Sequence, residues 1–264
     1  MSFDWYELVT NSFTQGDIFL GFPVPVAKPK EDHPYFLMGW TRKNVIVVTQ
    51  ACDIEQGKVD TISFCEIVSI NEITKEIIEN EKRVSFIDQQ KNKLLSLKKL
   101  TPELGSLGVD LQALLKEIKD IDLLKKTIED LKKQVNEEEN IKILDDFLTQ
   151  FIESSDIRMD FTNEGDLKKA RKYIDKIRKG EFTNMHLLNQ CKIGGELKMA
   201  GQVVLLKDTY QVLVESVEKI INNCYQDGHL RLLPPYREHL AQAYSNTFNR
   251  IGLPQDIEID KLQF

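Results

Sequence analysis

The stretch from Val45 to Ile70, VIVVTQACDIEQGKVDTISFCEIVSI, decides how the rest of the chain is interpreted. Two runs rich in β-branched and aromatic residues, Val45–Thr49 and Thr61–Ile67, flank a polar segment that contains Asp53 and Gly57. Such runs, joined by a glycine-bearing turn, are typical of an antiparallel hairpin. The first run begins with successive apolar residues rather than alternating ones, which predicts a central strand covered on both faces.

The composition is that of a globular protein. The chain has 264 residues, of which 41% are hydrophobic and 29% are charged, so it can bury a core. Its formal net charge of −7 argues against a protein whose whole surface follows nucleic acid. No apolar run reaches the roughly 20 residues of a membrane helix, and the acidic start MSFDWYELVT differs from a basic signal peptide. We therefore predict a cytoplasmic protein with no direct membrane insertion.

The cysteines and histidines give no sign of a metal site. The four cysteines are widely spaced and form no CxxC pair, so buried, reduced thiols are the expected state. HExxH, Walker, GxGxxG and GxSxG motifs are all absent from the sequence. Neither a metal nor a cofactor is predicted.

The part before Val45 is predicted to be mostly β structure. Met1–Gln15 is expected to form a short helix and a turn, and a strand is expected to begin at Gly16. No helix could cross the prolines that follow, so a long loop is expected there. These prolines are Pro23, Pro25, Pro29 and Pro34. Tyr35–Trp40 predicts a further strand.

From about Asn71 to Gly180, lysine, glutamate, leucine and isoleucine replace the strand formers, and helices are predicted. Apolar residues at three- and four-residue steps over 111–135 predict one amphipathic helix of about seven turns. A second apolar stripe covers Ile141–Phe151. Asp166 is expected to cap a third helix that runs to Gly180.

β character returns after Gly180. His186–Leu188 and Gln202–Lys207 predict strands, whereas Tyr210–Cys224 fits either a strand or a helix. The small residues of Lys192–Gly201 predict a loop or an irregular pair of strands.

A last helix over Tyr236–Ile251 follows two prolines and ends before Gly252. The strands on either side of the helical block are too few to bury a core alone. We therefore predict an α+β protein in which residues 1–70 and 185–264 form one β unit with a closing C-terminal helix. Residues 71–184 would be a long helical insertion, and strands from the two ends of the chain should pair in one sheet.

Two parts of the sequence resemble the MazF/PemK family of toxins. Gly16-Asp17-Ile18, the strand VIVVTQ and Thr61 at the start of a strand look like that fold. TQ-x-CD and the terminal LLPPYREHLAQAYSNTFNRIGLP resemble a larger MazF-like group. The resemblance covers about residues 14–70 and 185–255, and it implies an SH3-like β-barrel with a C-terminal helix.

MazF enzymes cut single-stranded RNA without metal, with an arginine and a threonine. The resemblance implies that the threonine is Thr61 and that Lys43 takes the arginine's position, with Arg42 adjacent. A lysine supplies charge for a developing phosphorane but lacks the guanidinium fork. An exposed basic turn and an ordinary strand threonine are the alternative interpretation, and no catalytic residue is expected.

Cys52, Asp53 and Arg237 each have a chemical and a structural interpretation. Cys52 could be a nucleophile if the fold brings a histidine near, but a buried thiol beside a central strand is favoured. Asp53 could be a general base, although an aspartate that opens a tight turn is commoner. Arg237 is expected to reach Asp53 and to hold the last helix on the barrel.

The order of the parts, the length and the insertion also resemble the CalpT family of CRISPR-associated proteins. That resemblance implies a regulatory anti-sigma factor of type III antiviral signalling rather than an enzyme. Its partners would be a CalpS-like sigma factor, which it sequesters, and a CalpL-like SAVED–Lon protease. Cyclic oligoadenylate activates the protease, which then cleaves the anti-sigma factor. The alternative is a metal-independent MazF-like endoribonuclease; no nucleic-acid partner is expected under the first hypothesis.

The insertion is expected to hold the sigma factor through an apolar stripe and a basic helix face. The expected partner-binding residues are Leu111, Leu114, Ile118, Ile121, Lys168, Lys169, Arg171 and Lys172. The basic residues could also form an RNA-binding face, but few aromatic residues are interleaved to stack on bases. A solvated helix face is favoured for them, with an acidic protein partner next.

Proteolytic release needs an accessible segment that lacks regular structure. The expected cleavage region consists of Gly194, Gly195, Lys198, Met199, Ala200 and Gly201. The alternative for this segment is an ordinary β-turn between strands.

Overall fold

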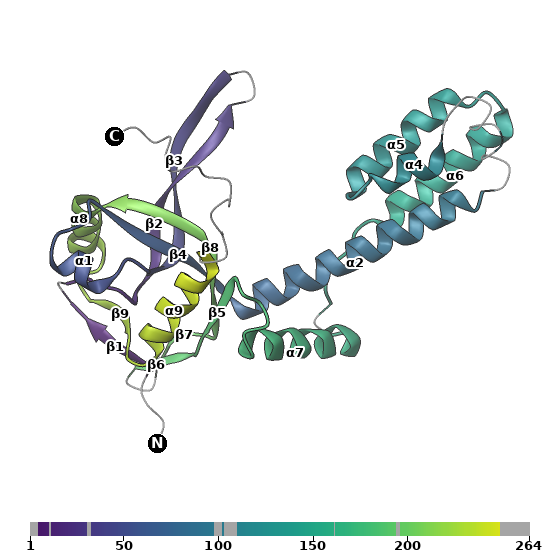
Figure 1. Cartoon of the computed structure of the whole chain (residues 1–264). Coiled ribbons are helices and arrows are strands. Elements are labelled where there is room, and N and C mark those ends of the chain that lie inside the picture. The colour runs from purple at the N-terminus through teal and green to yellow at the C-terminus, as the bar shows by residue number, and fades with distance from the viewer. Residues whose placement is uncertain are drawn as a thin grey trace, which may run out of the picture. The chain divides into compact units, whose positions relative to one another are not determined.

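The computed structural model describes residues 5–248 except 11, 31–32, 98–101, 103–109, 161 and 194–195. Contacts divide the chain into two compact units (Figure 1). The sheet unit contains Met1–Ile73 and Tyr173–Phe264, and the helical unit contains Thr74–Lys172.

An antiparallel sheet forms the centre of the sheet unit. Among the described residues its strand order is β1-β9-β2-β3-β4-β8-β5, and every neighbouring pair is antiparallel. The strands are β1 (Tyr6–Val9), β2 (Asp17–Lys30), β3 (His33–Val47), β4 (Thr61–Ser69), β5 (Met185–Leu188), β8 (Gln202–Leu213) and β9 (His229–Leu232). β9 lies between β1 and β2, and β8 pairs with β4, which confirms that strands from the two ends of the chain share a sheet. The edge strands are β1 and β5, so the described strands form an open sheet and close no barrel.

Both faces of this sheet are covered, as the apolar run at Val45 predicted. Ile46 and Val48 belong to one buried cluster, while Val45 and Val47 belong to another. Successive side chains point to opposite faces of a strand, so one run supplies two cores. Leu240 of α9 (Tyr236–Phe248) belongs to the first cluster. Helix α8 (Val214–Cys224) covers the second with Val217 and Ile221.

The predicted hairpin is present, but its link contains a short helix. β3 and β4 pair with Asn44 opposite Ile67 and Val47 opposite Phe64. Between them lies α1 (Ala51–Glu55), followed by Gly57 in the left-handed region at φ 60°.

The N-terminal segment forms a strand where a helix was predicted. Residues 6–9 pair with β9, from Tyr6 opposite Leu232 to Val9 opposite His229. Four residues are too few to show a periodicity, and the partner strand lies more than two hundred positions away. The prediction was wrong because a pairing over that distance leaves no local signal.

The predicted proline loop is instead part of two strands, since Pro23, Pro25 and Pro29 lie in β2 and Pro34 lies in β3. Pro23, Pro25 and Pro29 lie opposite Arg42, Trp40 and Phe36 of β3. They occupy alternate positions, so their nitrogens can all face away from β3. Among the described residues, β2 pairs on that other side with β9 at Asp17 and Ile18 alone. Because no strand needs a donor there, the prolines interrupt no ladder. β2 and β3 thus form a two-stranded arm (Figure 1).

The helical unit packs around its own core. It contains most of α2 (Ile70–Leu95), α4 (Leu111–Lys116), α5 (Ile121–Gln134), α6 (Glu138–Ser154) and the first part of α7 (Glu164–Arg178). The buried cluster draws on α2, α4, α5 and α6, and its members are Ile87, Leu94, Leu111, Leu115, Ile118, Leu124, Ile128, Leu131, Val135, Leu144 and Phe151.

The single long helix predicted over 111–135 is broken in two. The first helix ends at Lys116, and Asp120 starts a second one: its Oδ1 accepts a hydrogen bond from Leu123 N at 2.6 Å and caps α5. Asp110 caps α4 in the same way, with Ala113 N at 3.1 Å. Lys91 of α2 donates to the carbonyl of Ile118, which the break leaves without a helical partner.

Asp166 does not cap α7. The Oδ1 atom of Asn163 accepts from Gly165 N at 2.8 Å and from Asp166 N at 3.2 Å, which is the role predicted for Asp166. The helix begins at Glu164 and ends at Arg178, with Gly180 in the left-handed region at φ 70°. Asp166 lies inside the first turn, where its carboxylate is free for a contact with another helix.

Candidate functional site

Lys43, which takes the arginine's position in the MazF resemblance, is held in an ion pair within the sheet. Its Nζ lies 2.7 Å from Oε1 of Glu66 on β4. The second oxygen of Glu66 accepts the hydroxyl hydrogen of Tyr210 on β8, also at 2.7 Å. The Glu66 side chain is only 13% exposed. Burial, followed by the hydrogen bond to Glu66, raises the pKa of Tyr210, so the hydroxyl keeps its proton.

Thr61 lies far from Lys43. Thr61 is the first residue of β4, and Ile67, six positions later, lies opposite Asn44, the neighbour of Lys43. Because a strand rises about 3.3 Å per residue, Thr61 and the end of β4 that lies opposite Asn44 are about 20 Å apart along the strand. Arg42 is exposed and donates through Nη1 to Gly21 O at 3.1 Å. The structure therefore brings neither basic residue to Thr61.

Cys52 and Asp53 lie together on the surface at α1. The Cys52 side chain is exposed rather than buried, whereas Ile54 of the same helix packs against the second buried cluster. Its Sγ lies 3.7 Å from Asp53 Oδ1 and 3.8 Å from Gln50 Oε1. The prediction of a buried thiol was wrong for Cys52 and for Cys224, which is exposed, while Cys65 and Cys191 are buried.

Asp17 of the Gly16-Asp17-Ile18 motif is the centre of a buried charged cluster. Arg231 donates to its two oxygens, through Nε at 2.6 Å and Nη2 at 2.9 Å. Nε2 of His229 lies 2.8 Å from Oδ2, and Thr14 N donates to the same oxygen at 2.9 Å. The hydrogen bond to Asp17 raises the pKa of Arg231. The cluster ties β2 to β9, and removal of one partner would leave a buried charge.

The two MazF-like motifs touch each other. Gly16 has φ 88°, and a Cβ atom there would lie 3.0 Å from Arg237 Cγ. Arg237 donates to Glu238 Oε1 through Nη2 at 2.8 Å, rather than forming the expected pair with Asp53. The stem of Arg237 thus packs on the glycine turn and joins α9 to β2.

A cavity of about 530 Å³ lies where the end of α7, strand β5 and the start of α9 meet, entirely within the sheet unit. His186 of β5 and His239 of α9 line it, together with Arg178 of α7. One wall carries the rings of Trp5 and Tyr236, which stack with centroids 3.7 Å apart. Burial, with a smaller contribution from His239, lowers the pKa of His186 to about 4, so its imidazole is neutral near pH 7.

Sequence reasoning missed this cavity. Two of its residues, Tyr236 and His239, belong to the PPYREHLAQ motif, which was the available signal. Trp5 and His186 carry no motif, and only the strand order brings them to the same place.

The expected partner-binding residues of the helical unit divide into buried and exposed sets. Leu111 and Ile118 are 4% and 3% exposed in the core, so a partner could reach them only by unpacking the helices. Ile121 packs against the same core, and Leu114 is exposed. The basic residues Lys168, Lys169, Arg171 and Lys172 are all exposed on α7.

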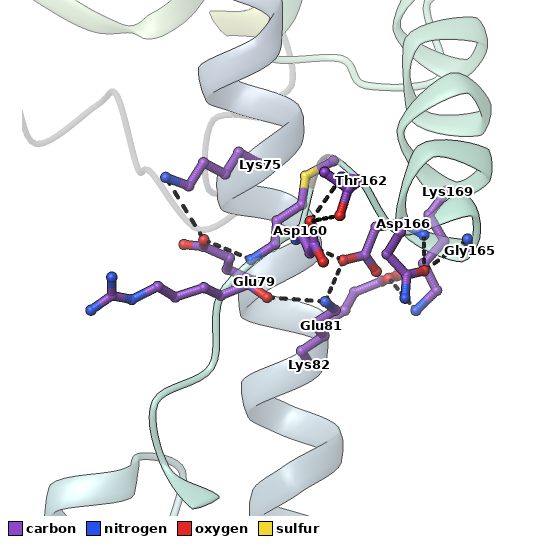
Figure 2. Close-up of polar contacts among 12 residues, drawn as sticks. Lys75, Glu79, Glu81, Lys82, Asp160, Thr162, Gly165, Asp166 and Lys169 are labelled. Carbon is purple, nitrogen blue, oxygen red and sulfur yellow. Dashed lines mark hydrogen bonds and ion pairs between the residues drawn. The ribbon is translucent and has the colours of Figure 1, made fainter.

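A polar cluster joins α2 to the start of α7 inside the helical unit. Figure 2 shows Lys82 of α2 pointing at Asp166, with Nζ 2.5 Å from Oδ2. Asp160 N donates to the same oxygen at 3.0 Å, and Glu79 Oε1 accepts from Met159 N at 3.0 Å. The hydrogen bond from Lys82 lowers the pKa of Asp166, which stays ionised. The connection from α6 to α7 is therefore fixed to α2 by side chains.

The expected cleavage region belongs to a second, small sheet. β6 (Cys191–Ile193) pairs with β7 (Glu196–Met199), while Gly194 and Gly195 lie outside the described residues. Lys198 and Ala200 are exposed, Gly201 is half-buried, and Met199 is buried in the sheet core.

Among the residues that the structure describes, no three His, Cys, Asp or Glu side chains come together as a metal site would require. In the same residues, no helix has the length and apolar character needed to cross a membrane. Comparison with known proteins gives no relative: no family model, no curated protein and no solved structure matches this chain.

Proposed function

We propose that this chain is a regulatory protein of the anti-sigma type, which binds a sigma factor in the cytoplasm until a protease cuts it. The observation that carries the proposal is that Thr61 lies six residues along β4 from Ile67, which is opposite Asn44, so Thr61 and the Lys43 end of β4 are separated by about 20 Å along the strand. A positively charged side chain must lie next to the reacting phosphate to stabilise the charge that develops in the transition state. Lys43 is also neutralised by Glu66, so this pair suits a stable sheet better than RNA cleavage.

The fold relationship is part of the proposal. We infer an open variant of the SH3-like MazF/PemK barrel, because an antiparallel sheet packs on a C-terminal helix through Leu240. The helical unit interrupts it between β4 and β5. In this interpretation the sheet unit is a scaffold, and the helical unit supplies the binding surface.

The surface best suited to a helical partner is a groove on α2 rather than the buried leucine and isoleucine stripe. This α2 groove has a volume of about 830 Å³ and is lined by Ile77, Asn80, Glu81, Val84, Ser85, Asp88, Gln89, Asn92 and Lys169. Val84 is 57% exposed at its centre. Residues that are three and four positions apart on α2 form one face of the helix. An amphipathic partner helix can bind by laying its apolar face against such a surface.

The basic face of α7 adjoins this groove at Lys169. Lys169 lines the groove, and its Nζ is 3.9 Å from Glu81 Oε2. Exposed charges of one sign mainly accelerate the encounter with a partner of opposite sign. The proposed sigma factor would therefore present an acidic patch to Lys168, Arg171 and Lys172.

Release would follow cleavage in residues 194–201 by a protease of the SAVED–Lon type in type III CRISPR signalling. A cut near Ala200 would divide the chain of 264 residues and 30.5 kDa into pieces of about 23 and 7 kDa. β8 remains hydrogen-bonded to β4 from Thr61 to Ser69 after such a cut. The pieces would therefore stay associated through β4 and β8 in native buffer and separate in denaturant.

The test compares two substitutions at neighbouring positions of α2 for binding to the co-encoded sigma factor. Val84→Glu places a charge in the groove and should weaken binding about tenfold or more. Arg83→Glu changes an exposed residue outside the groove and should leave the affinity within about twofold. Equal binding by both variants would refute the groove. RNA cleavage by the parent chain that is lost in Thr61→Ala would support the endoribonuclease instead.

A further inference from the structure

The cavity of the sheet unit differs in charge from the rest of the molecule. The whole chain carries a formal charge of −7. Among the described residues that line the cavity, none is an aspartate or a glutamate. The ionisable lining groups are instead Arg178, His186 and His239, from α7, β5 and α9. A concave surface lined only by basic ionisable groups favours an anion.

The remaining lining is apolar and partly aromatic. Aliphatic side chains such as Ile174 and Ile177 face the same space as the stacked Trp5 and Tyr236. A volume of about 530 Å³ lies within the range of small-molecule sites. A bare inorganic anion would leave most of this apolar surface in contact with water, so the lining suits a larger molecule.

We propose that this cavity binds a small organic anion with a flat apolar body, of the nucleoside monophosphate class. The site is independent of the proposed sigma-factor groove, since its residues belong to the sheet unit. Arg178 and His239 contact the phosphate, and the base lies against the wall that carries the rings of Trp5 and Tyr236.

The position of each basic group fits this arrangement. Arg178 is largely exposed and shares its guanidinium with Asp175 through one Nη1 contact of 3.2 Å, so its other donors remain available. His239 lies in the first turn of α9, where the helix dipole favours a negative group. Asn189, also in the lining, adds an amide that can donate to the base or the sugar.

His186 makes binding depend on pH. Its imidazole is neutral in the empty site, because burial and then His239 lower its pKa to about 4. A bound anion favours the protonated ring and raises this pKa, so binding takes up a proton. The charged groups that face His186 are His239 and Arg178, and both are cationic when charged. Affinity should therefore rise as the pH falls from about 7 toward 5.

Trp5 serves as the reporter. The chain has two tryptophans, so full-length Trp40→Phe protein leaves Trp5 as the single tryptophan. Adenosine 5′-monophosphate is titrated against adenosine and against inorganic phosphate. The expected result is saturable quenching by the nucleotide, with at least tenfold weaker binding of each of the two fragments. Equal binding of phosphate alone would refute the apolar subsite, equal binding of adenosine would refute the anion subsite, and no binding at millimolar nucleotide would refute both.

Matched variants locate the ligand. Arg178→Gln and His239→Gln should each weaken nucleotide binding about tenfold, as expected for a charge-assisted contact. Lys179→Gln removes a neighbouring exposed charge outside the cavity and should change the affinity less than twofold. Because the nucleotide phosphate also titrates near neutral pH, the pH profile is compared with that of His186→Gln. If the nucleotide affinity of the parent depends on pH no more steeply than that of His186→Gln, the proposed role of His186 is contradicted.

Discussion

Removal of the His186 imidazole should make the sheet unit less sensitive to acid. The unfolded chain binds a proton at this residue with a pKa near 6.5, whereas burial lowers the pKa in the folded state to about 4. Between these values the unfolded state holds more protons than the folded state. Folding stability is therefore fully present above pH 6.5 and is lost as the pH falls through the window to 4.

The magnitude follows from the difference of 2.5 between the two pKa values, 6.5 and about 4. At about 1.36 kcal/mol per unit, the limit is about 3 kcal/mol. A domain of this kind is stable by about 5–15 kcal/mol in total, so the loss should be measurable. His186→Gln keeps a polar side chain on β5 and cannot take up a proton in this range.

The assay is urea unfolding of the parent and of His186→Gln, each in the Trp40→Phe background, from about pH 7.5 to about pH 4. Trp5 fluorescence reports on the sheet unit alone, since Trp5 stacks on Tyr236 of α9. Carboxylates also titrate in this range, so the quantity compared is the difference between the two proteins at each pH. This difference should change by about 3 kcal/mol in favour of the variant on acidification. A difference that stays constant with pH would refute the reasoning.

Two further substitutions test contacts within single units. Asp166→Asn removes the charge that holds α7 to α2. Thermal unfolding of the helical unit should show a loss of about 1–2 kcal/mol in folding stability, a modest figure because the lysine partner is partly exposed. The control Asp156→Asn, in an exposed ion pair, should have almost no effect. Gly16→Ala meets both a left-handed backbone and the Arg237 stem at 3.0 Å, whereas Gly57→Ala meets a left-handed backbone with no atom within 4 Å. Urea midpoints should therefore show a larger loss for Gly16→Ala than the roughly 1 kcal/mol expected for Gly57→Ala, and equal losses would exclude a contribution from Arg237.

The sheet was predictable where its signal is local. The apolar run at Val45 predicts a strand covered on both faces, because a strand with one face in water would alternate apolar and polar residues. The count of strands on either side of the helices also predicts that the two ends pair, since neither set could bury a core. The strand at Tyr6–Val9 was not predictable in this way, because its partner β9 lies at the other end of the chain.

The prolines of β2 and the break before α5 show a second limit. A proline excludes a helix, but whether it excludes a strand depends on which side of that strand lacks a partner. Apolar residues continue at helical spacing from Leu115 across Ile118 to Ile121, so periodicity alone hides the break. Asp120 was the available signal, since an aspartate inside an apolar stripe is a frequent N-cap.

The candidate site was predictable only in its residues and not in its geometry. The resemblance supplies Lys43 and Thr61 as a pair on neighbouring strands, but their distance depends on the register of β3 and β4. In that register Lys43 lies beside one end of the β3–β4 ladder, and Thr61 lies beyond its other end. The cavity around His186 depends on the same kind of information, because its lining comes from both ends of the chain.

The leucine and isoleucine stripes of the helical unit show a third limit of prediction from sequence. An apolar stripe predicts that a helix face is buried, but it does not say whether the chain itself or a partner covers that face. Here α2, α4, α5 and α6 cover one another, and Leu111 and Ile118 are inside their core. A partner surface must then be sought among apolar residues that the unit leaves uncovered. Val84, in the α2 groove, is such a residue, and this is why the sigma-factor test changes Val84 rather than the stripe.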